Sequence, residues 1–170
     1  MRALEKSGLT AGDIMSRDLV TIPLSATVCA LAMILHENKI SGAPVVDAHG
    51  HLAGVVSQSD LVRDEMKGHP RERSTFYTRF DDEDLAALRE GFIEEDFGES
   101  TVADICTPYT ITAAVDSTLE TLVALMVEKD IHRVLVVDGR KVVGIVTSMD
   151  ILRKLARARP VGAERCLVAH

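Results

Sequence analysis

Ser41-Gly42-Ala43-Pro44-Val45-Val46-Asp47 is a short apolar run that ends in an aspartate, and Gly54-Val55-Val56-Ser57-Gln58-Ser59-Asp60 is a second run of the same kind. The turn residues Asp47-Ala48-His49-Gly50 lie between them. Short β-branched runs that are bounded by turn residues are typical of strands. The sequence therefore predicts two adjacent strands, Ala43 to Val46 and Leu52 to Val56.

The same sequence motifs occur twice along the chain. Asp13-Ile14-Met15 returns 91 residues later as Asp104-Ile105-Cys106, and Val45-Val46-Asp47 returns at the same offset as Val136-Val137-Asp138. After a one-residue deletion in the following turn, the offset becomes 90: Gly54, Val56, Asp60 and Arg63 match Gly144, Val146, Asp150 and Arg153. Turns tolerate such a deletion. The chain is therefore predicted to be two copies of one unit.

Each copy has the predicted order β-α-β-β-α. A short extended segment comes first, and a helix with apolar residues at helical spacing follows, capped by Thr27 in one copy and Thr118 in the other. One unit has too small a core to stand alone, so we expect an α/β (α+β) fold with the two repeats packed around a pseudo-twofold axis. The expected boundaries are repeat 1 at 9–66, a helical insertion at 67–99, repeat 2 at 100–156 and a C-terminal tail at 157–170.

Composition and charge exclude several classes of protein. The chain has 170 residues, of which 46% are hydrophobic and 26% charged, as in soluble globular proteins. Its net charge of −7 argues against nucleic-acid binding, which needs a basic surface. No apolar stretch is long enough to span a membrane, and no signal peptide is visible. Three dispersed cysteines (Cys29, Cys106 and Cys166) predict neither disulfides nor a metal cage, so we expect a cytoplasmic protein.

The segment 67–99 differs from both repeats. It holds ten acidic and five basic residues, and all four phenylalanines of the chain. Asp81 to Asp96 can form a helix with Leu85, Leu88 and Phe92 on one face. A disordered acidic linker would lack these aromatic residues. We therefore expect an ordered insertion that packs either on its own module or on a partner.

The repeated motifs resemble a tandem pair of CBS domains, the regulatory repeat named after cystathionine β-synthase. The resemblance covers about 9–66 and 100–156, and it implies a disc-shaped Bateman module with two equivalent clefts that commonly dimerises. In this family the clefts often bind adenosine-containing ligands such as AMP, ADP, ATP, NAD(H) or S-adenosylmethionine. The family usually regulates a neighbouring enzyme, channel or kinase domain. This chain carries no such domain and resembles the free-standing members.

A hydroxyl and a carboxylate recur three residues apart at the end of each unit's last strand, as Ser57 and Asp60 and as Thr147 and Asp150. A carboxylate can accept both hydroxyls of a ribose, and the family uses these positions for adenosine. The same spacing before an apolar helix is also a capping box, which satisfies amides at the helix start. The two roles are compatible, because a helix N-terminus also favours an anionic ligand.

His132 and Arg133 lie where the second repeat's apolar run begins, and the pair resembles the phosphate-binding repeats of the γ subunit of AMP-activated protein kinase. A guanidinium there can hold a phosphate through two parallel bonds, although a surface salt bridge is an alternative role for Arg133. The resemblance implies that each cleft combines both repeats. The first is expected to contain Ser57, Asp60, Thr110, Ile111, Ile131, His132 and Arg133. The second is expected to contain Thr147, Asp150, Val20, Thr21, Gly42, Ala43 and Pro44, with Arg133 as a further candidate.

These patterns predict a non-catalytic, energy-sensing regulatory module. It is expected to bind AMP, ADP or ATP, with or without Mg²⁺, and to signal to a regulated protein of unknown identity. We expect a homodimer with no covalent cofactor and no metal site, because His49 and His51 lie in a turn without further ligands. One alternative is a ligand-free interaction scaffold that acts through 67–99. The other is an enzyme, either a nucleotide hydrolase or a redox protein that uses Cys106.

Overall fold

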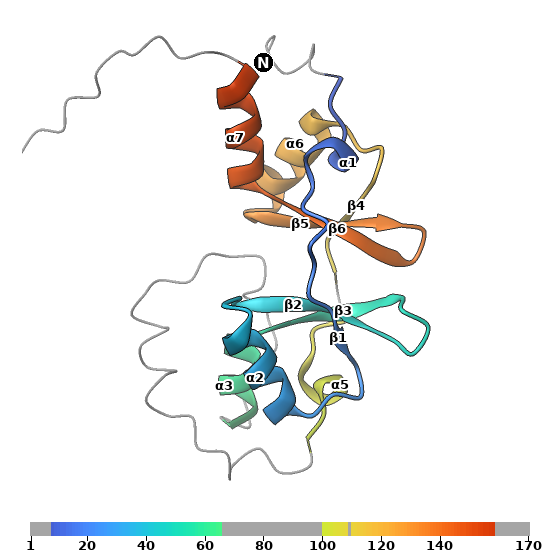
Figure 1. The fold of residues 1–170 in the computed structure, drawn as a ribbon, viewed down its shortest axis with the longest axis vertical. Helices are drawn as coiled ribbons and strands as arrows, with labels where there is room; N and C mark the ends of the chain where they lie inside the picture. Colours follow the sequence, from blue (N-terminus) through green and yellow to red (C-terminus); the bar gives the residue numbers. More distant parts are fainter. Residues whose placement is uncertain (1–7, 66–99, 109, 159–170) are drawn as a thin grey trace, which may run out of the picture.

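Two three-stranded sheets form the centre of the molecule (Figure 1). The computed structural model describes residues 8–65, 100–108 and 110–158. The sheets consist of β1 (Ile22–Pro23), β2 (Gly42–Val46) and β3 (Leu52–Ser57), and of β4 (Thr112–Ala114), β5 (Arg133–Asp138) and β6 (Lys141–Thr147). In each sheet the first strand is parallel to the second, and the second is antiparallel to the third. The predicted mixed α and β class and the doubled strand pattern are thereby confirmed.

Helices lie on the outer side of each sheet (Figure 1). They are α1 (Ala11–Ile14), α2 (Val28–Glu37), α3 (Gln58–Glu65), α5 (Val102–Ile105), α6 (Leu119–Lys129) and α7 (Ser148–Ala158). Thr27 caps α2 by accepting the Ala30 amide at 3.1 Å, and Thr118 caps α6 by accepting the Thr121 amide at 3.3 Å. Both caps agree with the sequence prediction. The helix predicted over 81–96 lies outside the described residues.

The two sheets share one irregularity at equivalent positions. The pairing of β2 with β3 shifts register between Val45 and Val46, and that of β5 with β6 shifts between Val136 and Val137. Such a bulge bends the strand and increases its twist. The first strands are short, and only Ile22 and Pro23 pair in β1. The doubled bulge indicates that the two repeats agree in detail as well as in element order.

Each repeat gives its first helix to the other repeat. In Figure 1, α1 lies with β4, β5 and β6, whereas α5 lies with β1, β2 and β3. Ala11 of α1 belongs to the buried cluster around Leu119 and Val134, and Val102 of α5 belongs to the cluster around Ile22 and Leu31. The two cores are therefore mixed, and neither sequence repeat is complete as a structural unit.

Reciprocal hydrogen bonds hold these exchanged segments in place. Ser16 and Ile145 exchange backbone bonds of 2.9 and 3.0 Å, and Thr107 and Val55 exchange two bonds of 2.9 Å. Ser16 corresponds to Thr107 in the repeat, and Ile145 corresponds to Val55. The two bridges are thus the same contact made in opposite directions. This is the pattern that a pseudo-twofold arrangement requires.

Two glycines allow the exchanged segments to approach the last strands. A Cβ atom on Gly54 would lie 2.7 Å from the Thr107 carbonyl oxygen, and one on Gly144 would lie 2.9 Å from the Ser16 carbonyl oxygen and 2.5 Å from the Met15 sulfur. Real Cβ atoms do not approach backbone so closely. The glycine that opens each Gly-Val-Val or Gly-Ile-Val run is therefore required by the exchange.

We expect Gly54→Ala and Gly144→Ala each to lower the free energy of unfolding by about 1–3 kcal/mol, because the added methyl forces the bridging backbone away. In a chain of this size that corresponds to a fall in Tm of about 2–4 °C per kcal/mol, measurable by circular dichroism. Gly50→Ala is the control. It has a φ of +76° and nothing within 4 Å of an added Cβ, so it adds backbone strain without a clash. A loss in Gly54→Ala no larger than that in Gly50→Ala would contradict this role.

Candidate functional site

The predicted hydroxyl and carboxylate meet at the start of the last helix in both repeats. Asp60 Oδ2 accepts the Ser57 amide at 2.8 Å and the Ser57 hydroxyl at 2.7 Å. Asp150 Oδ2 accepts the Thr147 amide at 2.9 Å and the Thr147 hydroxyl at 2.6 Å. The strand must turn into a helix at this point, and the carboxylate satisfies an amide that the helix leaves without a partner. The capping role is therefore present in both copies.

The same cap also occurs at the exchanged helices. Asp13 Oδ2 accepts the Thr10 amide and hydroxyl, both at 2.8 Å, and Asp104 Oδ2 accepts those of Thr101 at 2.8 and 2.7 Å. These hydrogen bonds hold the pKa of Asp13 below its usual value. Cap geometry alone consequently does not distinguish a ligand site. The Asp104 cap provides an internal control for the two predicted sites.

Burial separates the two candidate sites from each other. Ser57 is fully buried and Asp60 is 4% exposed, whereas Thr147 and Asp150 are both partly exposed. The Ser57 hydroxyl also lies 2.9 Å from the Ser59 hydroxyl. Two sites that form the same cap thus have different access to solvent.

The starts of β2 and β5 lie next to these caps. Gly42 pairs with Ser57, and Arg133 pairs with Thr147, in the register of their antiparallel ladders. Directly opposed residues project to the same face of a sheet, so Arg133 and Thr147 share a face. Arg133 is half-buried, and this desolvation lowers the pKa of its guanidinium. His132 is exposed, and its carbonyl accepts the Ser148 amide at 2.9 Å.

The remaining predicted residues lie along the first strands and beside their partners. Thr21 and Val20 lead into β1, where Ile22 pairs with Val45, and Val20 packs on the first core. Thr110 and Ile111 lead into β4, where Thr112 pairs with Leu135, and Ile111 packs on the second core. Ala43 and Pro44 are buried within β2. The parallel pairings therefore place each predicted first-strand segment beside the second-strand start of its own repeat.

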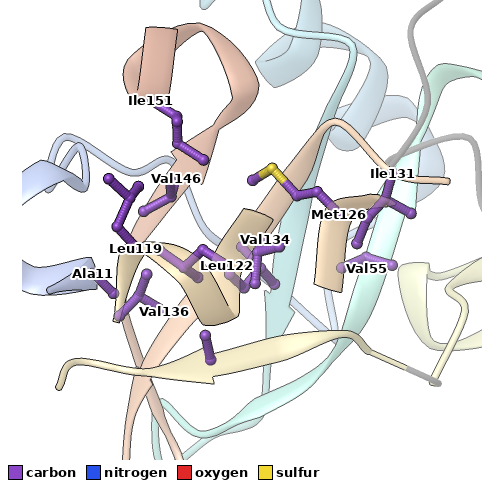
Figure 2. Close-up of a cluster of buried hydrophobic side chains, with 12 residues drawn as sticks. Ala11, Val55, Leu119, Leu122, Met126, Ile131, Val134, Val136, Val146 and Ile151 are labelled. Atoms are coloured by element: carbon purple, nitrogen blue, oxygen red, sulfur yellow. The ribbon is translucent and has the colours of Figure 1, made fainter. Parts of the chain in front are cut away.

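One buried side chain joins the two repeats close to the first predicted cleft. Val55 of β3 is fully buried in the cluster that contains Ile131 and Met126 (Figure 2). Ser57 follows Val55 by two residues, and Ile131 precedes Arg133 by two. The end of β3 is thus close to the loop before β5.

Two residues near the caps were not predicted as site residues. Arg153 Nη1 lies 3.5 Å from Asp150 Oδ1, one turn along α7. The Gln58 side-chain carbonyl oxygen is buried and has no hydrogen-bond partner, while the Gln58 side-chain amide donates to the Ile40 carbonyl at 3.4 Å. The repeat itself contained the signal for Arg153, since the arginine recurs three residues after each aspartate. Nothing in the local sequence marked Gln58.

The turn histidines and the cysteines are the remaining candidates. Asp47 Oδ1 accepts the amides of His49 and His51 at 2.8 and 2.9 Å, which organises the turn and lowers the pKa of Asp47. The described part of the chain contains no group of three or more metal-ligating side chains. Within the described residues Cys29 and Cys106 form no disulfide, and Cys106 is buried. None of the described helices is long and apolar enough to cross a membrane.

The two repeats exchange their first helices, and each has a cap where its last strand turns into a helix. Together they form a tandem-repeat module. The family model of the CBS domain matches residues 11–67 and 102–157. The chain therefore belongs to the CBS-domain family, with two copies of the domain.

Relatives and solved structures agree with this assignment. The chain is 31% identical over 151 residues to MJ1426 of Methanocaldococcus jannaschii, covering 84% of this chain and 89% of that protein. It is 29% identical to the chloroplastic CBSX2 of Arabidopsis thaliana, covering 88% of this chain and 64% of the relative.

Two crystal structures with bound ligands have the same fold. CBSX2 in complex with AMP has a TM-score of 0.63 and 26% identity, covering 88% of this chain and 97% of that chain. The CBS domain pair of MJ0100, in complex with 5′-methylthioadenosine and S-adenosyl-L-methionine, has a TM-score of 0.61 and 26% identity, covering 89% and 98%. The bound molecules in both relatives contain adenosine.

We expect Asp60→Ala to lower the free energy of unfolding by about 2 kcal/mol, because it leaves the buried Ser57 amide and hydroxyl without their acceptor. Asp150→Ala should cost about 1 kcal/mol, since water can reach the more exposed Thr147 groups. Urea unfolding followed by far-ultraviolet circular dichroism measures both. Equal losses of unfolding free energy in the two variants would mean that the difference in burial does not change how much each cap stabilises the fold.

Proposed function

We propose that this chain is a non-catalytic regulatory module that binds an adenine nucleotide between its two CBS repeats and transmits the occupancy to a partner protein. Membership of the CBS-domain family carries the proposal, because the resemblance to that family assigns the ribose to Ser57 with Asp60 and to Thr147 with Asp150. The AMP complex of CBSX2 and the adenosyl complexes of MJ0100 support an adenosine-containing ligand. AMP, ADP and ATP are the ligands that we favour, with Mg²⁺ accompanying the longer phosphate chains.

The first cleft combines Ser57 and Asp60 with the segments 110–111 and 131–133. Its support is the burial of Val55 in the same cluster as Ile131, which brings the end of β3 close to the loop before β5. The Asp60 carboxylate would accept the ribose hydroxyls, and Arg133 would hold a phosphate. Desolvation of the half-buried Arg133 strengthens its attraction for an anion. The second cleft combines Thr147 and Asp150 with the segments 20–21 and 42–44.

Ligand binding would act through the exchanged bridges. A nucleotide that contacts both repeats favours one spacing of the two sheets over another. It changes the populations of these two states only by the difference in its affinity for them. The bridges Ser16–Ile145 and Val55–Thr107 couple the sheets, so a change at one cleft reaches both repeats. The proposed compartment is a reducing one such as the cytoplasm, in which cysteines such as Cys29 and Cys106 stay reduced.

A thermal-shift screen with AMP, ADP, ATP, NADH and S-adenosylmethionine, with and without Mg²⁺, tests the proposed function. A ligand at a hundredfold excess over its Kd stabilises the folded chain by about 2.7 kcal/mol. We expect an increase in Tm of several degrees for at least one compound. In the Asp60→Ala, Arg133→Ala double variant, calorimetry should show loss of the binding that belongs to the first cleft, as fewer bound ligands per chain. Asp104→Ala, which removes an equivalent cap on α5, should leave affinity and stoichiometry unchanged. Unchanged affinity and stoichiometry in the double variant would refute the first cleft.

The second candidate function is a ligand-free scaffold that acts through 67–99. This segment lies outside the described residues, and its support is its sequence, with ten acidic residues and all four phenylalanines. No compound in the screen would then change the Tm, and a protein partner would bind the full chain but not a variant with Phe80, Phe92 and Phe97 changed to Ser. An enzyme would instead convert the bound nucleotide, which a chromatographic product assay detects.

We also propose that the chain forms a homodimer through α6 and α7. Val127 of α6 is 76% exposed, and Met149 and Leu152 of α7 are 51% and 56% exposed. The two helices pack side by side (Figure 1), so these side chains give one module several exposed apolar positions.

The Val127→Glu, Leu152→Glu double variant is expected to sediment as a monomer at concentrations where the unmodified chain is a dimer. Charged side chains at these two positions would have to be desolvated in the interface. Met33→Glu is the control, since Met33 is 53% exposed on α2 of the other repeat. Analytical ultracentrifugation distinguishes the outcomes, and a dimer that persists in the double variant would place the interface elsewhere.

A further inference from the structure

The two carboxylate oxygens of Asp150 have different partners. Oδ2 accepts the amide and hydroxyl of Thr147 at 2.9 and 2.6 Å, and it belongs to the cap of α7. Oδ1 instead lies 3.5 Å from Nη1 of Arg153. The cap fixes the carboxylate in place, and the outer oxygen is the one that an incoming group would approach.

The contact with Arg153 is easily displaced, in contrast to the cap. The Arg153 side chain is 67% exposed and that of Asp150 is 23% exposed. An ion pair of this exposure contributes little stability, because water and salt screen the attraction. The two hydrogen bonds from Thr147 are shorter and lie deeper. A ribose can therefore displace the guanidinium from Oδ1 without disturbing the start of α7.

The displaced guanidinium would remain close to the ligand. Arg153 follows Asp150 by three residues on the same helix, so both side chains lie on neighbouring positions of one helix face. A guanidinium presents several N–H donors in a plane that matches the oxygens of a phosphate. Arg133 lies opposite Thr147 across the β5–β6 ladder, so a second cation borders the same cap.

Resting on the proposed function, we propose that Arg153 is a specificity-determining residue of the cleft that contains Thr147 and Asp150. In the unliganded chain Arg153 pairs with Asp150 Oδ1. When a phosphorylated adenosine compound binds, its ribose takes Oδ1 and its phosphate takes Arg153, so the guanidinium exchanges one anion for another. Adenosine displaces the same guanidinium but offers it no anion. The cleft therefore selects phosphorylated adenosine compounds over adenosine.

Isothermal titration calorimetry of the full chain with AMP and with adenosine tests this proposal. The titrations use an Asp60→Asn background, which disables the first proposed cleft. We expect Arg153→Ala to weaken AMP binding about tenfold or more, as loss of a charge-assisted contact does, without weakening adenosine binding. Arg153→Lys should recover part of the AMP affinity. Arg157→Ala, one turn further along α7 with the same change in charge, should leave the ratio of the two affinities within about twofold of the background.

The possible results separate the inference from the proposed function. If Arg153→Ala weakens the binding of AMP and of adenosine by the same factor, or changes the binding of neither, Arg153 does not determine specificity. The inference then fails while the proposed function stands. If the background binds S-adenosylmethionine but no phosphorylated compound, the inference is also wrong while a regulatory adenosyl site stands. If the unmodified chain binds none of these compounds, the proposed function fails, and the inference fails with it.

Discussion

The close crossing of backbone at Gly54 and Gly144 is the constraint on which the rest of the structure depends. At each crossing the chain that follows one repeat's first helix pairs with the last strand of the other repeat, and a Cβ at the glycine would meet backbone within 3 Å. The exchange places Ala11 in one core and Val102 in the other. Each core is thus built from both repeats, so the stability of one cannot be separated from that of the other.

The same constraint decides what the caps can do. Because the bridges hold β3 and β6 at fixed positions, the helices that follow them begin at defined places, with a carboxylate at each start. A cap uses one oxygen of an aspartate and leaves the orientation of the other fixed by the same bonds. At Asp150 this second oxygen faces Arg153. The structural and the ligand-binding interpretations of the motif are therefore not rivals, since the cap is what preorganises the carboxylate.

Much of this arrangement could be predicted from local pattern, and the exceptions have physical causes. The apolar runs 43–46 and 134–137 lie in strands, and Thr27 and Thr118 are caps, because short-range propensity dominates at those positions. The exchange of α1 and α5 was not predicted, because a helix of four residues has too little periodicity to indicate which core it joins. The unequal burial of Asp60 and Asp150 also escaped prediction, since it depends on neighbours that are distant in the sequence.

The unequal burial of the two caps affects how a module with two sites can respond to ligands. If both sites had the same solvent access and the same charges, they would bind a ligand with the same affinity. The number of occupied sites would then depend only on the ligand concentration. Asp60 lies almost fully buried beside Ser57, whereas Asp150 is partly exposed and paired with an exposed arginine. Opening the first site requires desolvated groups to separate, and opening the second requires only the displacement of a weak ion pair. The two repeats form the same cap but differ in its burial, so ligands at the two proposed sites would have to supply different free energies. Under that proposal, such a difference would allow one chain to respond to two ligands, or to one ligand in two steps.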